Sequence, residues 1–143
     1  VIIDDIKIKA VKAYNLERER PHQKINNWIG YIISSNDFSI YHAGDTGLIP
    51  EMNNYYADIA LVPVSGTYVM SPDDAIEAIK IINPQIAIPM HFDSNLNRYW
   101  KIFPGVGTVE DAEKFCDGIK FFCKALIYQE FNEEKKFIRT TYF

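Results

Sequence analysis

The sequence predicts an α/β fold, and three observations support that prediction. Residues 58–64 and 85–90 are short, continuous apolar runs, which is typical of strands covered on both faces. Between them, residues 71–82 have the pattern of an amphipathic helix with clear start and stop signals. Alternation of strand, helix and strand indicates a sheet with helices on at least one face. We expect residues 1–143 to form a single domain, which is an ordinary size for one.

The composition is that of a soluble globular protein, and it excludes several classes. The net charge is −4, with 15 basic and 19 acidic side chains and no basic tract, so no nucleic-acid partner is expected. The longest apolar runs, such as residues 59–64, are too short to span a membrane, and no signal-peptide pattern occurs. Cys116 and Cys123 are too few for a disulfide framework and are expected to be small buried hydrophobic residues. We therefore predict a cytoplasmic protein.

The first third of the chain predicts two β-hairpins separated by a polar loop. Apolar side chains alternate with lysines in the second strand, as in a half-buried strand. Asp4-Asp5 and Asn36-Asp37 supply the turns, and residues 15–26 form the loop. The strands expected here are residues 1–3, 6–13, 27–35 and 38–42.

Helix signals are strong in the middle of the chain. Ser71 is a good N-cap, Pro72 suits the first helical position, and the acids that follow are favoured by the helix dipole. Asn83-Pro84 ends this helix. Thr108 caps a second helix, which runs to Asp117 or somewhat beyond.

The remaining segments are less regular. Residues 48–56 predict a short helical turn with Pro50 near its start, and residues 93–107 predict an irregular loop. Residues 121–131 have two interpretations. They form a closing hairpin with residues 135–143, or they prolong the preceding helix, because their apolar residues also fit helical spacing.

Asp45 is the first candidate for a functional group. It follows a predicted strand and lies between Gly44 and Gly47, which let the backbone bend on both sides of the carboxylate. His91 directly follows another predicted strand, and His22 lies in a loop that leads to a third. In open α/β sheets, functional groups gather beyond the carboxyl ends of strands, so these side chains can converge at one edge.

One aspartate and two histidines suit a divalent metal such as zinc, iron or manganese, which makes a bound water a nucleophile near neutral pH. Each residue also has a plainer interpretation. Asp45 can cap the turn that follows it, His91 can be a hydrogen-bonded core residue, and His22 can be an ordinary surface residue. His42, nearest in sequence to Asp45, is expected to support a ligand by a hydrogen bond.

Three blocks of the sequence, in this order, resemble the metallo-β-lactamase superfamily. They are Tyr41-His42-Ala43-Gly44-Asp45-Thr46, Asp58-Ile59-Ala60-Leu61-Val62-Pro63-Val64 and Ile88-Pro89-Met90-His91-Phe92. The resemblance covers about residues 1–118 and is greatest to the ascorbate-6-phosphate lactonase-like metal-dependent hydrolases.

That resemblance implies a four-layer αββα sandwich with metals at its mouth. It implies that Asp45 bridges two metals, that His91 is the last histidine ligand, and that His22, or failing that Asn15, is the intermediate one. It also implies a metal-held hydroxide that attacks an ester, lactone or phosphoester-type bond of a small molecule. Zinc is the expected metal, with manganese or iron as alternatives. Residues expected to support the ligands or contact substrate are His42, Thr46, Asn15, Thr67, Tyr68 and the loop 95–101.

The sequence departs from the family pattern at its start. The family's first signature, a His-x-His-x-Asp-His loop, is absent, because no histidine precedes His22. The chain also begins with Val1, so we interpret it as the C-terminal portion of the sandwich, incomplete at its N-terminus. With Asp45 shared, each metal would keep about two protein ligands, against three in a catalytic zinc site. We therefore expect weak metal binding, or an unfilled site, in this chain by itself.

Two functions follow from this interpretation. The chain is part of a metal-dependent hydrolase that is active with its missing half, or it is a truncated or degenerate relative that serves as a non-catalytic binding or assembly module. A missing half would uncover sheet edges and an apolar face. We therefore expect self-association, or pairing with a missing N-terminal half. The fold does not select the substrate.

Overall fold

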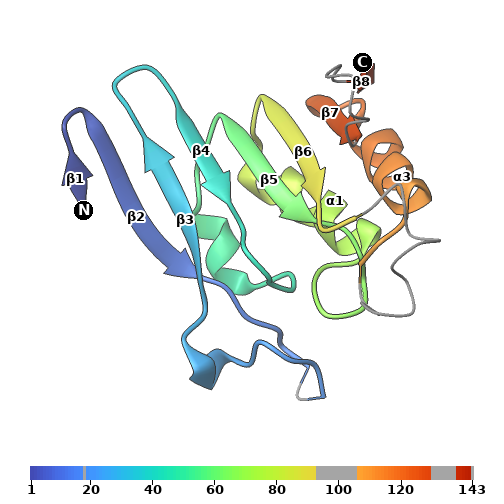
Figure 1. Ribbon diagram of the computed structural model, residues 1–143, viewed down its shortest axis with the longest axis horizontal. Coiled ribbons are helices and arrows are strands. Elements are labelled where there is room, and N and C mark those ends of the chain that lie inside the picture. The colour runs from blue at the N-terminus through green and yellow to red at the C-terminus, as the bar shows by residue number, and fades with distance from the viewer. Residues whose placement is uncertain (18, 93–105, 130–137, 143) are drawn as a thin grey trace.

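The computed structural model describes residues 1–17, 19–92, 106–129 and 138–142. Within these residues, eight strands form one mixed sheet, in the order in which they occur along the chain (Figure 1). The strands are β1 (Ile2–Ile3), β2 (Ile6–Lys12), β3 (Ile29–Ser34), β4 (Ser39–His42), β5 (Ile59–Pro63), β6 (Ile86–Met90), β7 (Lys124–Gln129) and β8 (Ile138–Tyr142). The helices are η1 (Lys24–Asn26), η2 (Pro50–Asn54), α1 (Pro72–Ile82) and α3 (Val109–Ile119).

The directions of the strands decide which loops lie together. β1 to β4 are antiparallel, which confirms the two predicted hairpins, and β4 to β7 are parallel. The carboxyl ends of β4, β5 and β6 therefore meet at one edge of the sheet. The long loop between β2 and β3 reaches the same edge, because β2 ends and β3 begins there.

Capping residues define both α-helices, as the sequence predicts. Ser71 Oγ accepts a hydrogen bond from the Asp74 N–H at 3.2 Å, and the Asp74 carboxylate accepts one from the Ser71 N–H at 3.1 Å. Pro72 occupies the first position of α1, and Asn83 ends the helix with a left-handed φ of 53°. Thr108 caps α3 with the same reciprocal arrangement. These bonds satisfy N–H groups that a helix start otherwise leaves unpaired.

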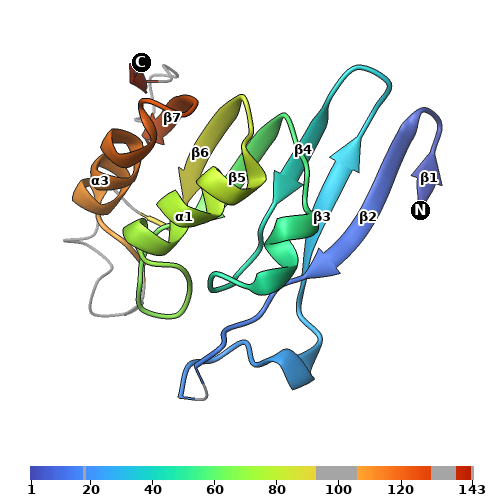
Figure 2. The same cartoon turned by 180° about the vertical axis from the view of Figure 1, so that it is seen from behind.

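The helices α1, α3 and η2 lie on one face of the sheet, and the core fills the space between (Figure 2). Tyr41 and Val62 enter it from the sheet, Ile79 from α1, and Phe115 from α3, and all four are at most 1% exposed. Complete burial of an aliphatic or aromatic side chain contributes about 1.5–3 kcal/mol relative to exposure. The helical face therefore supplies the stability on which the loops at the sheet edge rest.

The opposite face of the sheet is less covered (Figure 1). The prediction that β5 is covered on both faces is wrong for the residues that the structure describes. Val62 on the helical face is fully buried, whereas Ile59 and Leu61 on the opposite face are only half-buried. Exposure rises toward β3, to 45% for Ile29 and 40% for Tyr31. The reason is that no helix of the described part lies over this face.

The chain after α3 forms a strand, which decides between the two interpretations of residues 121–131. The Ile119 carbonyl accepts hydrogen bonds from the Phe122 N–H at 2.7 Å and the Cys123 N–H at 3.2 Å, so the helix ends in a tight turn. β7 then pairs with β8 in the predicted antiparallel hairpin. Phe122, which belongs to the apolar spacing that suggested a longer helix, is 53% exposed, so that spacing does not mark one continuous buried face. The predicted loop 93–107 lies largely outside the described residues.

Candidate metal centre

Asp45 lies on the turn after β4, at the sheet edge where β5 and β6 also end. Gly44 has a left-handed φ of 66°, and a Cβ there would lie 2.9 Å from the Ile29 carbonyl oxygen, so the turn requires glycine. The Gly44 N–H donates to His42 Nδ1 at 3.1 Å, so His42, itself exposed, steadies the turn. The Asp45 side chain is 47% exposed and therefore open to a ligand.

Thr46 joins the Asp45 turn to the chain that leads to His22. Its Oγ1 accepts a hydrogen bond from the Tyr14 N–H at 3.0 Å and donates toward the carbonyl oxygens of Tyr14 and Gly47, at 3.0 and 2.9 Å. Thr46 is fully buried. A buried side chain cannot touch a substrate, so support of the ligands is the one predicted role that its position allows.

His91 directly follows β6 in an uncommon backbone conformation. Its φ is 63°, in the left-handed region that few residues other than glycine adopt. The Gly107 N–H donates to the His91 carbonyl at 2.9 Å and holds this backbone. On the ring, Nδ1 lies 3.0 Å from Ser65 Oγ, and Nε2 is directed to Asp45.

His22 is held in a similar way from the loop between β2 and β3. Its φ is 60°, and its carbonyl accepts a hydrogen bond from the Asn15 N–H at 2.8 Å. Nδ1 lies 3.4 Å from the Tyr68 carbonyl oxygen, to which only a ring N–H can donate. The ring also meets Trp28 edge-on, with the centroids 5.6 Å apart. These contacts leave Nε2 directed to Asp45.

The two histidines converge on one carboxylate oxygen. His22 Nε2 lies 3.6 Å and His91 Nε2 lies 3.9 Å from Asp45 Oδ2. Ligand atoms about 2.0–2.2 Å from a tetrahedral ion are roughly 3.4 Å apart, so small side-chain rotations would let each pair share an ion. The structure thus brings together the three residues that the sequence predicts as ligands.

The donor set fits part of a metal site. Imidazole and carboxylate suit zinc, iron and manganese, and the second nitrogen of each ring has an oxygen neighbour, as metal-binding histidines usually do. Among the described residues, however, no group of three or more histidine, cysteine, aspartate or glutamate side chains is arranged to hold an ion as it stands. A working centre therefore needs further ligands or a closer approach of these three.

Asn15, the alternative to His22 as a ligand, braces the loops around the site. It is 4% exposed, and its Nδ2 donates to the carbonyl oxygens of Pro21 and Tyr68. Its Oδ1 has no hydrogen-bond partner in the described part of the chain. The structure therefore places His22 beside Asp45 and gives Asn15 a role in holding the backbone.

Sequence reasoning missed Ser65, which orients the His91 ring. Ser65 follows β5 at the edge where Asp45 and His91 follow their own strands, so the same rule could have selected it. Thr67, a predicted substrate contact, is exposed on this loop. The predicted contacts in residues 95–101 lie outside the described residues.

A polar cluster ties the His22 loop to η2. The Tyr14 hydroxyl donates to Glu51 Oε2 at 2.8 Å, and Lys24 Nζ donates to Glu51 Oε1 at 3.1 Å. Burial raises the pKa of Tyr14, and its hydrogen bond to the Glu51 carboxylate raises it further. Burial also acts to raise the pKa of Glu51, but the hydrogen bonds from Tyr14 and Lys24 help to outweigh it and hold that pKa below its usual value.

Comparison with known proteins agrees with the fold and identifies the superfamily. Residues 1–91, more than half of the chain, match the beta-lactamase superfamily domain, so the chain belongs to that superfamily. A UPF0173 metal-dependent hydrolase of Staphylothermus marinus is 46% identical over 69 residues, covering 46% of this chain and 30% of the relative. One of Pelotomaculum thermopropionicum is 35% identical over 99 residues, covering 64% and 43%. Membership of the ascorbate-6-phosphate lactonase-like branch stays a prediction.

Solved structures confirm the metallo-β-lactamase-type α/β fold. A protein of Parabacteroides distasonis described as a metal-dependent hydrolase is 32% identical, with a TM-score of 0.59, over 74% of this chain and 50% of that one. Igni18, a metallo hydrolase of Ignicoccus hospitalis, is 24% identical, with a TM-score of 0.65, over 95% and 53%, and shows the fold alone. No helix in the described ranges is long and apolar enough to cross a membrane.

Proposed function

We propose that Asp45, His22 and His91 form part of the divalent-metal site of a metal-dependent hydrolase. The observation that carries this proposal is the convergence of both Nε2 atoms on one Asp45 oxygen, at 3.6 and 3.9 Å. Ser65 and the Tyr68 carbonyl face the opposite ring nitrogens and set the ring orientations. The similarity to proteins named metal-dependent hydrolases supports the same chemistry.

The residues of the centre have distinct parts in this chemistry. Asp45 would hold positive charge at the sheet edge, and the neutral imidazoles of His22 and His91 would fix its position. When bound, the metal supplies a Lewis acid and lowers the pKa of a water molecule. We propose an ester, lactone or phosphoester-type bond of a small molecule as the target. Hydrolysis of such a bond develops negative charge on oxygen in the transition state, which a cation stabilises. Zinc suits the donor set, as do manganese and iron.

The chain accounts for only part of a complete centre. It spans 30% to 43% of the length of the two relatives described above. We propose that residues 1–143 act as one domain and supply the C-terminal part of the fold. A catalytic zinc ion takes about three protein ligands, so the three residues here cannot serve two ions by themselves. Hydrolase activity is thus proposed for the complete centre.

Metal titration of the purified chain tests the site. We expect Co²⁺ or Zn²⁺ to bind, and Asp45→Ala, His22→Ala and His91→Ala each to weaken binding at least about tenfold, as loss of a ligand should. His42→Asn is the matched control, because it removes an imidazole near Asp45 while keeping an acceptor for the Gly44 N–H. Cobalt absorbance measures the affinity. If the three ligand variants bind the metal as tightly as the native chain and the His42→Asn control do, the proposal is refuted.

The apolar sheet face supports a proposal about assembly. Ile29 and Tyr31 on β3 are 45% and 40% exposed, and Ile59 and Leu61 on β5, across β4 from them, are half-buried. Two such faces can pack about 10 Å apart as a β-sandwich. We propose that the chain by itself associates through this face. Light scattering above micromolar concentration should show a dimer or larger species that Tyr31→Lys shifts toward the monomer, whereas a monodisperse monomer would exclude it.

The cysteines support a reducing compartment, which we propose is the cytoplasm. Cys116 is buried, Cys123 is half-buried, and both are free thiols. Reduced thiols are typical of cytoplasmic proteins. A disulfide in protein isolated without added reductant or oxidant would count against this proposal.

A further inference from the structure

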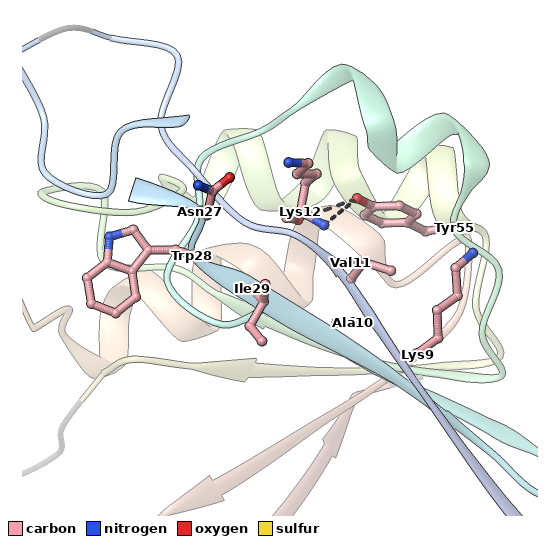
Figure 3. Close-up of a pocket in the computed structure, with 8 residues that line it drawn as sticks. All are labelled: Lys9, Ala10, Val11, Lys12, Asn27, Trp28, Ile29 and Tyr55. Atoms are coloured by element: carbon pink, nitrogen blue, oxygen red, sulfur yellow. Dashed lines mark hydrogen bonds between the residues drawn. The ribbon is translucent and has the colours of Figure 1, made fainter. Parts of the chain in front are cut away.

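Asn15 follows a segment of chain that is held from two sides. At the end of β2, the Lys12 N–H donates to the Tyr55 hydroxyl at 3.1 Å (Figure 3). Two residues later, the Tyr14 N–H donates to the buried hydroxyl of Thr46 at 3.0 Å. The backbone that leads to Asn15 therefore has a fixed position, and Asn15 itself is 4% exposed. Its side chain can act as a rigid spacer between the loops around it.

The Asn15 side chain contacts three loops at the sheet edge. Its amide nitrogen donates to the Pro21 carbonyl, in the loop between β2 and β3, and to the Tyr68 carbonyl at 2.7 Å, in the loop after β5. Its amide oxygen lies against the turn after β4, because a Cβ placed on Gly47 would be only 2.9 Å from Oδ1. A glycine in this turn leaves the space that the amide occupies. One buried side chain thus fixes how the three loops lie relative to each other.

Asn15 holds His22 at both its backbone and its ring. The Asn15 N–H donates to the His22 carbonyl at 2.8 Å, and the Asn15 amide binds the carbonyl of Pro21 just before it. These two bonds hold His22 at its φ of 60°, which residues with a side chain rarely adopt. The ring is held through Tyr68, because the carbonyl oxygen that lies 3.4 Å from His22 Nδ1 also accepts the hydrogen bond from Asn15.

The unpaired oxygen of Asn15 supports a role other than folding stability. Among the described residues, Oδ1 has no hydrogen-bond partner, and a buried acceptor without a partner destabilises a fold. The amide carries its donors and its acceptor on one carbon atom. Directing the NH2 group to two carbonyls therefore directs the oxygen to Gly47, whose N–H is already bonded to the Tyr14 carbonyl at 2.9 Å. Both donors are satisfied and the acceptor is not, as expected of a side chain that serves to hold the two carbonyl groups.

His91 is held by different residues. Its Nδ1 lies 3.0 Å from Ser65 Oγ, and its carbonyl accepts a hydrogen bond from the Gly107 N–H at 2.9 Å. The two imidazoles that converge on Asp45 therefore depend on separate sets of contacts. A change at Asn15 should affect one ring and not the other, which provides a comparison within the same molecule.

We propose that Asn15 is the positioning residue that sets the separation of His22 from Asp45, which is 3.6 Å between Nε2 and Oδ2. Asn15 acts on both sides of this separation, through the turn after β4 on one side and through the His22 backbone and ring on the other. Asn15 does not bind the ion itself, because its amide oxygen faces the Gly47 backbone. The inference rests on the proposed metal site, but the positioning is a property of the metal-free chain.

The mobility of each imidazole ring in the metal-free full chain tests the proposal. The chain has three histidines, so NMR relaxation of the ring carbon atoms can follow them one by one. In the native chain the His22 ring should be as rigid as the backbone. Asn15→Leu removes both donors, keeps a similar size and adds no charge. We expect it to make the His22 ring mobile on the picosecond-to-nanosecond timescale and to leave the His91 ring rigid.

Three further variants separate positioning from a general loosening of the fold. Asn15→Asp keeps the shape of the side chain but offers no donor at neutral pH, so it should free the His22 ring as Asn15→Leu does. Tyr14→Phe is the matched control, because it removes a hydrogen bond from an equally buried neighbour of Asn15 and should leave the His22 ring rigid. Ser65→Ala should give the reverse result, a mobile His91 ring and a rigid His22 ring.

Cobalt affinity distinguishes a failure of this proposal from a failure of the proposed function. We expect Asn15→Leu to weaken cobalt binding by about 10- to 100-fold, as loss of a group that orients a ligand does, and Tyr14→Phe to change it less than about threefold. If the native chain binds no cobalt but Asn15→Leu frees the His22 ring alone, the metal site fails and the positioning stands. If cobalt binds through His22 but Asn15→Leu neither frees the ring nor weakens binding, the role of Asn15 is overturned. A native His22 ring as mobile as that of the exposed His42 would overturn it without any variant.

Discussion

Thr46→Val replaces a buried hydroxyl by a methyl group of similar size and tests how the Asp45 turn is held. The Tyr14 N–H loses its 3.0 Å acceptor, while the Tyr14 carbonyl keeps the Gly47 N–H as a donor at 2.9 Å. An unsatisfied buried donor costs about 1–3 kcal/mol, so we expect the free energy of unfolding to fall by about 2 kcal/mol. With a urea m-value of about 2 kcal/mol/M, the unfolding midpoint should fall by about 1 M.

Thr46→Ser separates the hydrogen bond from packing. It keeps the hydroxyl and removes one methyl group, which contributes about 0.8 kcal/mol by burial. Thr46→Val should therefore be the more destabilised variant in urea unfolding followed by circular dichroism. A valine variant as stable as the native chain, or more stable than the serine variant, would refute the idea that the Tyr14 bond holds the turn.

Ser65→Ala should weaken cobalt binding by about 10- to 100-fold, because His91 loses the oxygen that orients its ring, and unchanged affinity would remove Ser65 from the centre. Glu51→Gln should flatten the acid side of the stability–pH curve. Because the pKa of Glu51 is lowered in the folded protein, ionised Glu51 stabilises the fold fully above its usual pKa of 4.5, and this stabilisation is lost as the pH falls through the folded-state pKa. If the free energy of unfolding falls equally with acid in both proteins, this reasoning is contradicted. Burial raises the pKa of Cys116 to about 12 and that of Cys123 to about 11, so both thiols should resist iodoacetamide near neutral pH until denaturant is added, and rapid labelling of the native chain would oppose that reasoning.

The helices were predictable because their signals are local. Ser71 and Thr108 each form a reciprocal pair with an acid three residues later, and such a pair defines a helix start wherever it occurs. The meeting of Asp45 with His91 was predictable for a different reason. Parallel strands end at a common edge, so Asp45 after β4 and His91 after β6 are brought to that edge on either side of β5.

Other features depend on contacts that no pattern in the sequence specifies. Ile59 and Leu61 belong to an apolar run of the kind that is typical of a strand covered on both faces. Whether a face is covered depends on what packs over it, and no helix of the described residues lies over the face that carries Ile59 and Leu61. The hydrogen bond between the Lys12 N–H and the Tyr55 hydroxyl joins residues 43 apart in sequence, and no local signal specifies it. Alternation of side chains predicts a strand but not the neighbours of its edge.

His22 and His91 adopt a left-handed backbone conformation that lowers the stability of the fold at two proposed metal ligands. Each of these conformations costs a residue with a side chain of order 1 kcal/mol, whereas glycine adopts it freely. A copy of this chain released from selection for imidazole at these two positions would be expected to acquire glycine or asparagine there and to become more stable. Histidine at both positions therefore indicates a requirement for the imidazole group itself and not a contribution to folding stability.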